Sequence, residues 1–189
     1  MTTLFCLLCI QGIIGAFDTL YYHEWHARLP ARGRNAAAEL KLHASRDFFY
    51  TIIFLTLPWL AWHGTWAYVL GFILVIEIFI TLCDFVVEKT VRKPLGDLFI
   101  GERITHGIMG ILYGVMIAQL IPILWGWSAL PTSLVITKYE MPSSLFWAIF
   151  ALGIGVFFSG IRDFYAALEL PYGHFPWRKI VQENQTTEN

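Results

Sequence analysis

Charged residues are scarce in this sequence. Only 14% of its 189 residues are charged and 57% are hydrophobic, whereas a typical soluble domain carries about 25% charged residues. The composition therefore argues against a soluble domain and predicts a membrane protein. The net charge is −1, so the chain also lacks the excess of lysine and arginine that typifies nucleic-acid binding. We expect no nucleic-acid partner.

Cysteine is scarce too. The three cysteines are Cys6, Cys9 and Cys83, and each lies in an apolar stretch. Cys6 and Cys9 form a Cys-x2-Cys pair, but no second pair accompanies it for zinc and no βαβ pattern surrounds it for redox chemistry. We expect all three to be small packing residues. The lack of placed thiolates argues against a copper(I) or iron–sulfur site.

Long hydrophobic runs, in contrast, fill much of the chain. Five are long enough to cross a hydrocarbon core of roughly 30 Å, which takes about 20 helical residues. The sequence therefore predicts an all-α integral membrane protein, with one membrane domain over residues 1–189 and five transmembrane helices. The predicted spans are 4–22, 36–62, 66–87, 104–127 and 145–170. The last belongs to an additional transmembrane segment, 142–170, and a cytoplasmic tail is predicted at 171–189.

The positive residues predict the orientation. With five spans, nearly all of them fall on one side of the membrane, and only Lys138 falls on the other. Because cytoplasmic loops are enriched in lysine and arginine, we expect the N-terminus outside and the C-terminus in the cytoplasm. The residues on the predicted cytoplasmic side are Arg28, Arg32, Arg34, Lys41, Arg46, Lys89, Arg92, Lys93, Arg103, Arg162, Arg178 and Lys179.

A charged motif occurs twice, each time where one hydrophobic segment leads into the next. Each copy contains Asp, then Glu-x3-Arg-x-Pro, then Glu-x3-His. We expect two parallel repeats, the hairpins 1–62 and 66–127, whose four helices form an antiparallel bundle. The first copy is Asp18, Glu24, Arg28, Pro30, Glu39 and His43, and the second is Asp84, Glu88, Arg92, Pro94, Glu102 and His106.

This motif has the chemistry of a metal site. Residues four apart share a helix face, so Glu39 projects with His43, and Glu102 with His106. An ionisable group in the membrane costs about 2.5–3.5 kcal/mol on insertion scales, and bound cations would compensate a cluster of them. Carboxylate and imidazole ligands suit iron, manganese or zinc. We expect two divalent ions, with iron favoured, held by Glu24, Glu39, His43, Glu88, Glu102 and His106.

The predicted arrangement resembles the di-iron and di-manganese carboxylate four-helix-bundle proteins. In those proteins two helices give a Glu and two give a Glu-His pair. They use Glu-x2-His where this chain has Glu-x3-His, so the resemblance is one of architecture and matches no named family. It implies a di-iron oxidoreductase that acts on a lipophilic substrate or quinol near the cytoplasmic leaflet. The expected partners are membrane lipid, a lipophilic small molecule and a redox partner.

Further polar residues have open roles at this stage. Asp18 and Asp84 are expected to accept hydrogen bonds from metal-bound histidines, or to bind metal directly. Either a π-bulge restores the register between Asp18 and Glu24, or Asp18, Tyr22 and His26 form the working face of the first helix. Arg162 and Asp163 would contact a substrate head group or form an ion pair. The remaining alternative ligands are His23, His26, Asp47 and Glu77.

Several other functions fit the same residues. A di-zinc membrane hydrolase would use the same ligands. The acids could instead line the path of an ion- or proton-coupled transporter. His43 and His106 could hold a b-type haem. Lastly, the charged residues could form a structural network with no ligand.

Overall fold

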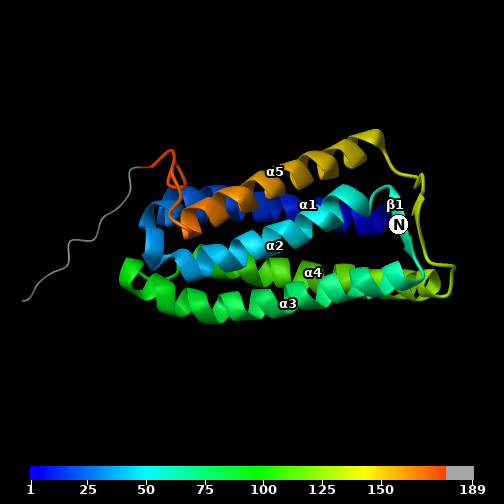
Figure 1. Ribbon diagram of the computed structural model, residues 1–189, viewed down its shortest axis with the longest axis horizontal. Coiled ribbons are helices and arrows are strands. Elements are labelled where there is room, and N and C mark those ends of the chain that lie inside the picture. The colour runs from blue at the N-terminus through cyan, green and yellow to red at the C-terminus, as the bar shows by residue number, and fades with distance from the viewer. Residues whose placement is uncertain (178–189) are drawn as a thin grey trace, which may run out of the picture.

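The chain folds into five long helices that lie side by side and a two-stranded sheet at one end (Figure 1). The computed structural model describes residues 1–177, without the side chain of Leu95. Most of the predicted tail, with Arg178 and Lys179, lies outside the described residues. In chain order the helices are α1 (Thr2–Phe17), the π-helix η1 (Asp18–Ala27), the 3-10 helix η2 (Leu29–Asn35), α2 (Ala37–Thr56), α3 (Thr65–Arg92), the 3-10 helix η3 (Lys93–Leu95), α4 (Ile100–Ser128) and α5 (Ser143–Ala167).

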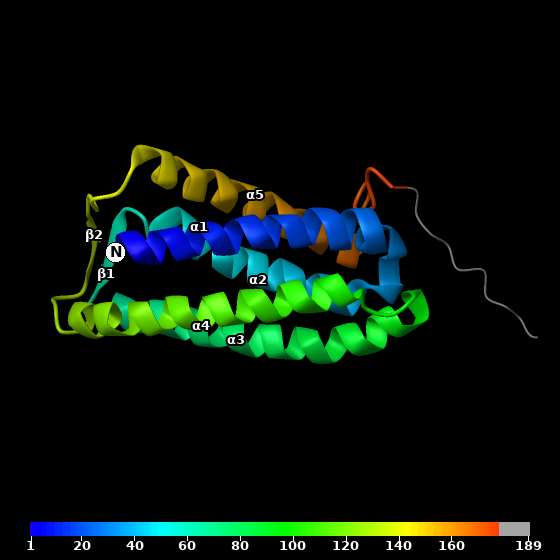
Figure 2. The same cartoon turned by 180° about the vertical axis from the view of Figure 1, so that it is seen from behind.

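Helix α5 is an integral part of the bundle. It was predicted as an addition to a four-helix bundle, but it packs against both α2 and α1. Figures 1 and 2 show α5 above α1 and α2, with α3 and α4 below them. Glycine permits the close approach, because a Cβ on Gly12 of α1 or Gly153 of α5 would lie 2.6 Å from side-chain atoms of α2. Small residues at helix contacts are typical of membrane bundles.

Four helical segments are long and apolar enough to cross a membrane: Thr2–Ala27, Thr65–Arg92, Ile100–Ser128 and Ser143–Ala167. Helix α2, the remaining predicted span, does not meet that criterion. It carries four charged residues within 20, and it ends at Thr56 instead of reaching residue 62. Helix α2 can carry these charges because it packs against α5 and α3.

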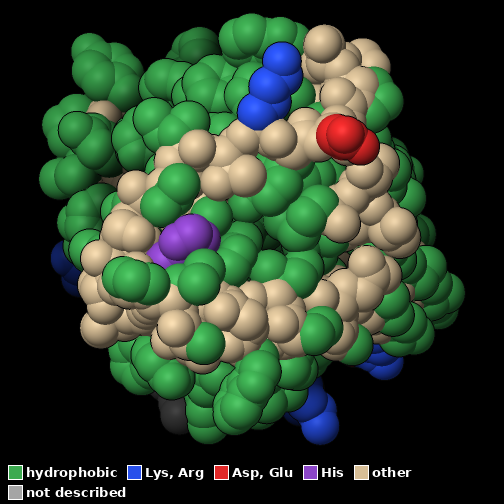
Figure 3. All heavy atoms as spheres, turned by 90° about the vertical axis from the view of Figure 1, so that its right-hand side faces the viewer, with side chains coloured by type: hydrophobic (Ala, Val, Ile, Leu, Met, Phe, Trp, Pro, Cys, Tyr) green, Lys and Arg blue, Asp and Glu red, His purple; other side chains and the backbone are tan. Residues whose placement is uncertain are grey.

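A short sheet, which the sequence analysis did not predict, closes the end of the bundle near the N-terminus. Strand β1 (Leu60–His63) follows a turn at Pro58 and pairs antiparallel with β2 (Ser133–Ile136). Figure 3 looks onto this end, where hydrophobic side chains and backbone dominate and charged groups are few. An apolar cluster that includes Phe5, Leu8 and Phe54 fills the adjoining part of the interior. The buried charges lie toward the opposite end.

Gly64, between β1 and α3, is required by the backbone geometry. Its φ is +60°, and an added Cβ would lie 2.6 Å from the Thr132 Cα atom. We expect Gly64→Ala to lower the free energy of unfolding by about 1–3 kcal/mol, because a side chain there strains the backbone and meets backbone atoms that cannot move away. Thermal unfolding in detergent measures this. Gly126→Ala on α4, where an added Cβ meets nothing within 4 Å, is the control and should be at least as stable as wild type.

Candidate metal centre

Ten acidic and imidazole side chains are buried inside the bundle, most of them near the end that carries η1 and η2. All five long helical segments contribute, counting η1 with α1. Each of the ten residues is at most 8% exposed. The acids are Asp18, Glu39, Glu77, Asp84, Glu88, Glu102 and Asp163, and the histidines are His23, His43 and His106.

The π-helix η1 determines which residues of the first segment face this group. In a π-helix, residues five apart align, so Asp18 and His23 project inward together. The His23 Nε2 atom lies 3.3 Å from Asp18 Oδ2 and 3.2 Å from Glu102 Oε1. Of the two alternatives left open by the sequence, the π-helical distortion is present, but it extends over ten residues and aligns Asp18 with His23 instead of Glu24. His26 is exposed, so the face of Asp18, Tyr22 and His26 is not formed.

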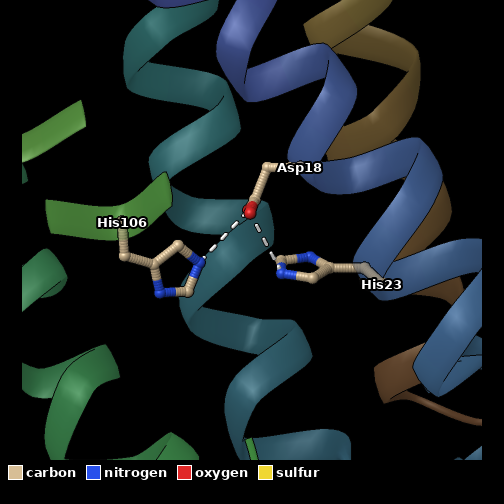
Figure 4. A group of neighbouring side chains, drawn as sticks. All are labelled: Asp18, His23 and His106. Carbon is tan, nitrogen blue, oxygen red and sulfur yellow. Dashed lines mark hydrogen bonds and ion pairs between the residues drawn. The ribbon is translucent and has the colours of Figure 1, made fainter. Parts of the chain in front are cut away.

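The two predicted repeats meet crosswise. Asp18 Oδ2 lies 3.2 Å from His106 Nε2, and Asp84 Oδ2 lies 3.3 Å from His43 Nε2. Each aspartate therefore faces the histidine of the other copy, as Figure 4 shows for Asp18 with His106 and His23. Glu88 adds a contact of 3.3 Å to His106 Nδ1. The expected pairing of the aspartates with the histidines is thus present, although the repeat itself stays a prediction.

The three imidazoles form one contiguous group. The His23 and His43 rings stack with centroids 4.4 Å apart, and the His106 ring meets His23 edge-on at 6.2 Å. Phe85 stacks on His106 and gives it an apolar wall. A haem held by His43 and His106 would have to displace the His23 ring, so this geometry gives the haem alternative no support.

Two arginines offset part of the negative charge. Arg92, only 2% exposed, donates from Nε to Glu39 at 2.8 Å and from Nη2 to Glu102 at 2.7 Å. Arg46 donates to Asp84 at 3.0 Å and lies 3.5 Å from Glu77. Arg92 thus joins the second copy of the motif to Glu39 of the first. The central place of Arg46 was missed, because α2 could face several ways from its sequence alone.

Several buried atoms of the group lack a hydrogen bond among the described residues. The atoms are Asp18 Oδ1, His23 Nε2, His43 Nδ1 and Nε2, Asp84 Oδ1, Glu88 Oε2 and His106 Nδ1. Burying such an atom without a partner costs about 1–3 kcal/mol. Several of these atoms still face an oppositely charged group at 3.2–3.3 Å, and a bound ion or water would satisfy the others.

Glu24, His26 and Arg162 lie outside the group, contrary to the roles expected for the first two as ligands. Glu24 pairs with Arg162 and accepts a hydrogen bond from Trp177 Nε1 at 3.1 Å. His26 is exposed and packs on the Phe99 ring. Arg162 also donates to the Phe175 carbonyl at 2.7 Å, so it anchors the segment after α5. The expected alternative of an ion pair for Arg162 is the one observed.

The other candidate residues border the group. Asp163, from α5, lies 3.7 Å from His43 Nδ1. Asp47 is half-buried and faces α5. A Cβ added to Gly160 of α5 would lie 2.9 Å from the Asp47 Cβ atom. Glu77 lies farther along the bundle and accepts a hydrogen bond from Thr81 at 2.8 Å. All three therefore remain within reach of a ligand bound among the helices, Asp163 most directly.

Two cavities adjoin the buried group. The larger, of about 390 Å³, lies between α1, α2 and α5 and includes Asp18, His23, His43 and Asp163 in its wall. The smaller, of about 210 Å³, lies between α2, α3 and α4 and includes Glu77 and His106. Gln11, Arg46, Tyr50 and Met109 border both cavities, so the group can be reached from two sides.

Asp18, His23 and His106 have the closest approach to a metal-binding arrangement. One ligand atom from each lies within 4.8 Å of the other two (Figure 4). These residues come from η1 and α4, whose packing on each other fixes the spacing. A comparison of the chain with protein-family models, with curated proteins and with solved structures finds no match.

Proposed function

We propose that this chain is a membrane-embedded oxidoreductase with two divalent metal ions, iron being favoured, that acts on a lipophilic substrate. One observation carries the proposal. Buried histidine nitrogens lie 3.2–3.3 Å from carboxylate oxygens, and most of those nitrogens have no hydrogen bond among the described residues. This is a donor set that has the composition of a metal site.

The separations support the proposal quantitatively. Metal bonds to imidazole nitrogen and carboxylate oxygen are about 2.0–2.2 Å long. Two such bonds at octahedral or tetrahedral angles place the ligand atoms about 3.0–3.4 Å apart. The contacts of Asp18 with His106 and with His23 are 3.2 and 3.3 Å. An ion bound there would satisfy His23 Nε2 and take the place of the hydrogen bond between Asp18 and His106.

Each ion would have its own ligands. Asp18, His23 and His106 would hold one, with Glu88 beside His106. His43 Nε2 and Asp84 would hold the other, with Glu39 at 3.9 Å from the same nitrogen, and Asp163, at 3.7 Å from His43 Nδ1, would orient the ring. Glu39 and Glu102, expected as bridging ligands, are tied to Arg92 in this structure. We therefore propose that Arg92 orients these two carboxylates toward the ions.

The charge balance also favours cations. Seven buried carboxylates face Arg46 and Arg92, which leaves an excess of five negative charges with neutral histidines and of two if all three histidines are protonated. Isolated buried charges are costly, and two divalent ions would remove the excess. Bound iron supplies the one-electron changes that oxidation of a lipophilic substrate by dioxygen requires. Zinc in the same place would support hydrolysis instead, and no contact in the structure favours that alternative.

We further propose that the four apolar helices lie in the bilayer, with the metal site near its cytoplasmic face. The large hydrophobic side chains exposed on α3 and α4 are those expected against lipid, Phe72 and Phe79 among them. The end that carries the site also carries nearly all described arginines and lysines, which is typical of the cytoplasmic side. A redox partner would reach the site from there.

Metal analysis of the purified protein tests this proposal, and one pair of variants sharpens it. We expect two equivalents of iron per chain after reconstitution with iron(II). His23→Gln should lose at least one equivalent, because its Nε2 faces Asp18 and Glu102. Glu24→Gln should keep both, because Glu24 pairs with Arg162 instead.

These variants distinguish the structure from the sequence motif. Loss of metal from Glu24→Gln with retention in His23→Gln would favour the ligand set that the repeat alone predicts. A wild-type protein that binds neither iron nor zinc would refute the proposed function. Stoichiometric zinc in place of iron, in a colourless protein, would support the hydrolase.

A further inference from the structure

The larger cavity runs along the bundle away from the buried group. Its α5 wall extends from Asp163 to Ala151, which corresponds to about 18 Å of helix at 1.5 Å per residue. At the Asp163 end its wall is polar. At the other end the wall is apolar and formed by Gly12, Phe54 and Leu152. The cavity is thus long and changes from polar to apolar along its length.

The cavity wall includes Leu20 of η1, which is 66% exposed. Ile13 and Phe17 on α1 are 57% and 49% exposed, and Phe158 on α5 is 63% exposed, so an entrance between these helices would be lined by apolar side chains. These residues lie on segments apolar enough to span a membrane. A molecule that enters here therefore comes from the lipid and not from water.

Small residues form the gap. Gly15 and Ala16 on α1 lie across from Ala151 and Gly155 on α5 in the cavity wall. A Cβ on Gly155 would meet nothing within 4 Å, and one on Gly15 would meet only the Met109 sulfur at 3.9 Å. Larger residues would fit sterically at both positions, and they would fill the cavity. The glycines therefore keep this space open and are not needed for helix contact.

Unpartnered polar atoms point to a ligand with a polar end. His43 Nδ1, which faces Asp163, lacks a hydrogen bond among the described residues, and so does Gln11 Oε1, which lies farther along the cavity beside Gly12. Both residues lie in the cavity wall. Gln11 is 5% exposed and His43 is 6% exposed. The carboxylates of Asp18, Asp47 and Asp163 line the end of the cavity at His43, with Arg46 beside them, so the metal-free protein disfavours a negatively charged head group.

We infer that this cavity binds a single long-chain alcohol or aldehyde that enters sideways from the lipid. Its alkyl chain lies along the apolar wall between α1 and α5, and its uncharged head reaches His43 and Asp163. The volume of about 390 Å³ falls in the range of 300–1,000 Å³ that is typical of small-molecule sites. The role of this molecule as substrate depends on the proposed function, but its binding can be measured without metal.

Photolabelling with a long-chain fatty alcohol that carries a diazirine on its alkyl chain tests this inference. We expect saturable labelling of peptides from α1 and α5 in the cavity wall. Unlabelled alcohol should compete, and a fatty acid of the same length should compete at least tenfold more weakly. Gly155→Trp should reduce labelling at least tenfold. Gly114→Trp on α4, also open but outside both cavity walls, should label like wild type.

The outcomes separate this inference from the proposed function. Gly155→Trp should keep the metal content of wild type, because residue 155 contacts none of the proposed ligands. If Gly155→Trp does not fold, Gly15→Leu fills the same space and replaces it. Saturable labelling of a protein that binds no metal would support the binding site and refute the metal chemistry. Labelling that does not saturate, or that is unchanged in both cavity variants, would overturn the inference, because the probe would then report only bulk lipid contact.

Discussion

Replacing Arg92 by methionine is expected to lower the free energy of unfolding by about 3–5 kcal/mol. Methionine has a similar length but removes the bonds of 2.8 and 2.7 Å to Glu39 and Glu102. Both carboxylates are at most 1% exposed, so water cannot replace the lost guanidinium. For a chain of this size the loss corresponds to a decrease in Tm on the order of 10 °C.

The repeat provides a matched control for this variant. Arg28 occupies the corresponding position in the first copy, but it is exposed and its guanidinium lies 4.6 Å from the ring centre of Trp177. We expect Arg28→Met to change stability by only about 0.5 kcal/mol, as is usual for surface substitutions. Arg92→Lys should fall between the two, because lysine keeps the charge but cannot reach both carboxylates with a planar fork. Equal Tm values for Arg92→Met and Arg28→Met in detergent would contradict this account.

A second measurement relates Arg92 to the proposed ions. If divalent ions and Arg92 neutralise the same carboxylates, added metal should recover part of the Tm that Arg92→Met loses. A ligand at 100 times its Kd stabilises the native state by about 2.7 kcal/mol. The recovery should not occur with magnesium, which keeps its water and prefers oxygen ligands. A purely structural network would show no metal-dependent recovery.

The sequence predicted the helices that are long and apolar enough to cross a membrane well, because their exposed surfaces are mostly apolar. Helices α3 and α4 cover the predicted segments and extend past them by a few residues. Helix α2 was the exception. Its charged residues are acceptable only where other helices cover them, and composition carries no information about which helix lies at the centre. Strand β1 was likewise missed, since its pairing with β2 depends on a contact 70 residues along the chain.

The sequence predicted most of the residues in the buried group, but not which residues of the first helical segment face inward. Five of the ligands predicted from the repeated motif, Glu39, His43, Glu88, Glu102 and His106, lie in one buried group, while their role as ligands and the repeat itself stay predictions. The prediction failed at Glu24, because a ten-residue π-helix shifts the inward face to His23. Local sequence does not encode that shift. The shift depends on packing between helices. Tyr22, for example, lies so close to α4 that a Cβ added to Gly101 would be 2.4 Å from the Tyr22 hydroxyl oxygen.

The double variant His43→Ala with His106→Ala is expected to lose both metal ions, and it has the largest predicted effect on metal binding. Each histidine faces an aspartate of the other repeat at 3.3 or 3.2 Å, and each would be a ligand to a different ion. Removing the His43 imidazole takes the nitrogen ligand from one ion, and removing the His106 imidazole takes a nitrogen ligand from the other. We expect bound iron to fall at least tenfold, as measured by elemental analysis after reconstitution.

A control with the same composition change separates ligand loss from general damage. His26 and His63 lie outside the buried group. His26 is exposed, and His63, in β1, lies beside the ring of Trp127. The variant His26→Ala with His63→Ala should keep two equivalents of iron. If His43→Ala with His106→Ala does not fold, glutamine at both positions keeps most of the volume and should still lose the metal.

Thermal stability gives the same test a readout that does not depend on activity. Added metal should raise the Tm of wild type and of the His26/His63 control, because an ion that binds only the native state stabilises it. It should not raise the Tm of the His43/His106 variant. Metal content and metal-dependent Tm that are unchanged in that variant would show that the imidazoles are not ligands. The buried acids would then be a structural network held by Arg92 and Arg46, and the orphaned nitrogens of His43 would need water or a protonated carboxylate as partner.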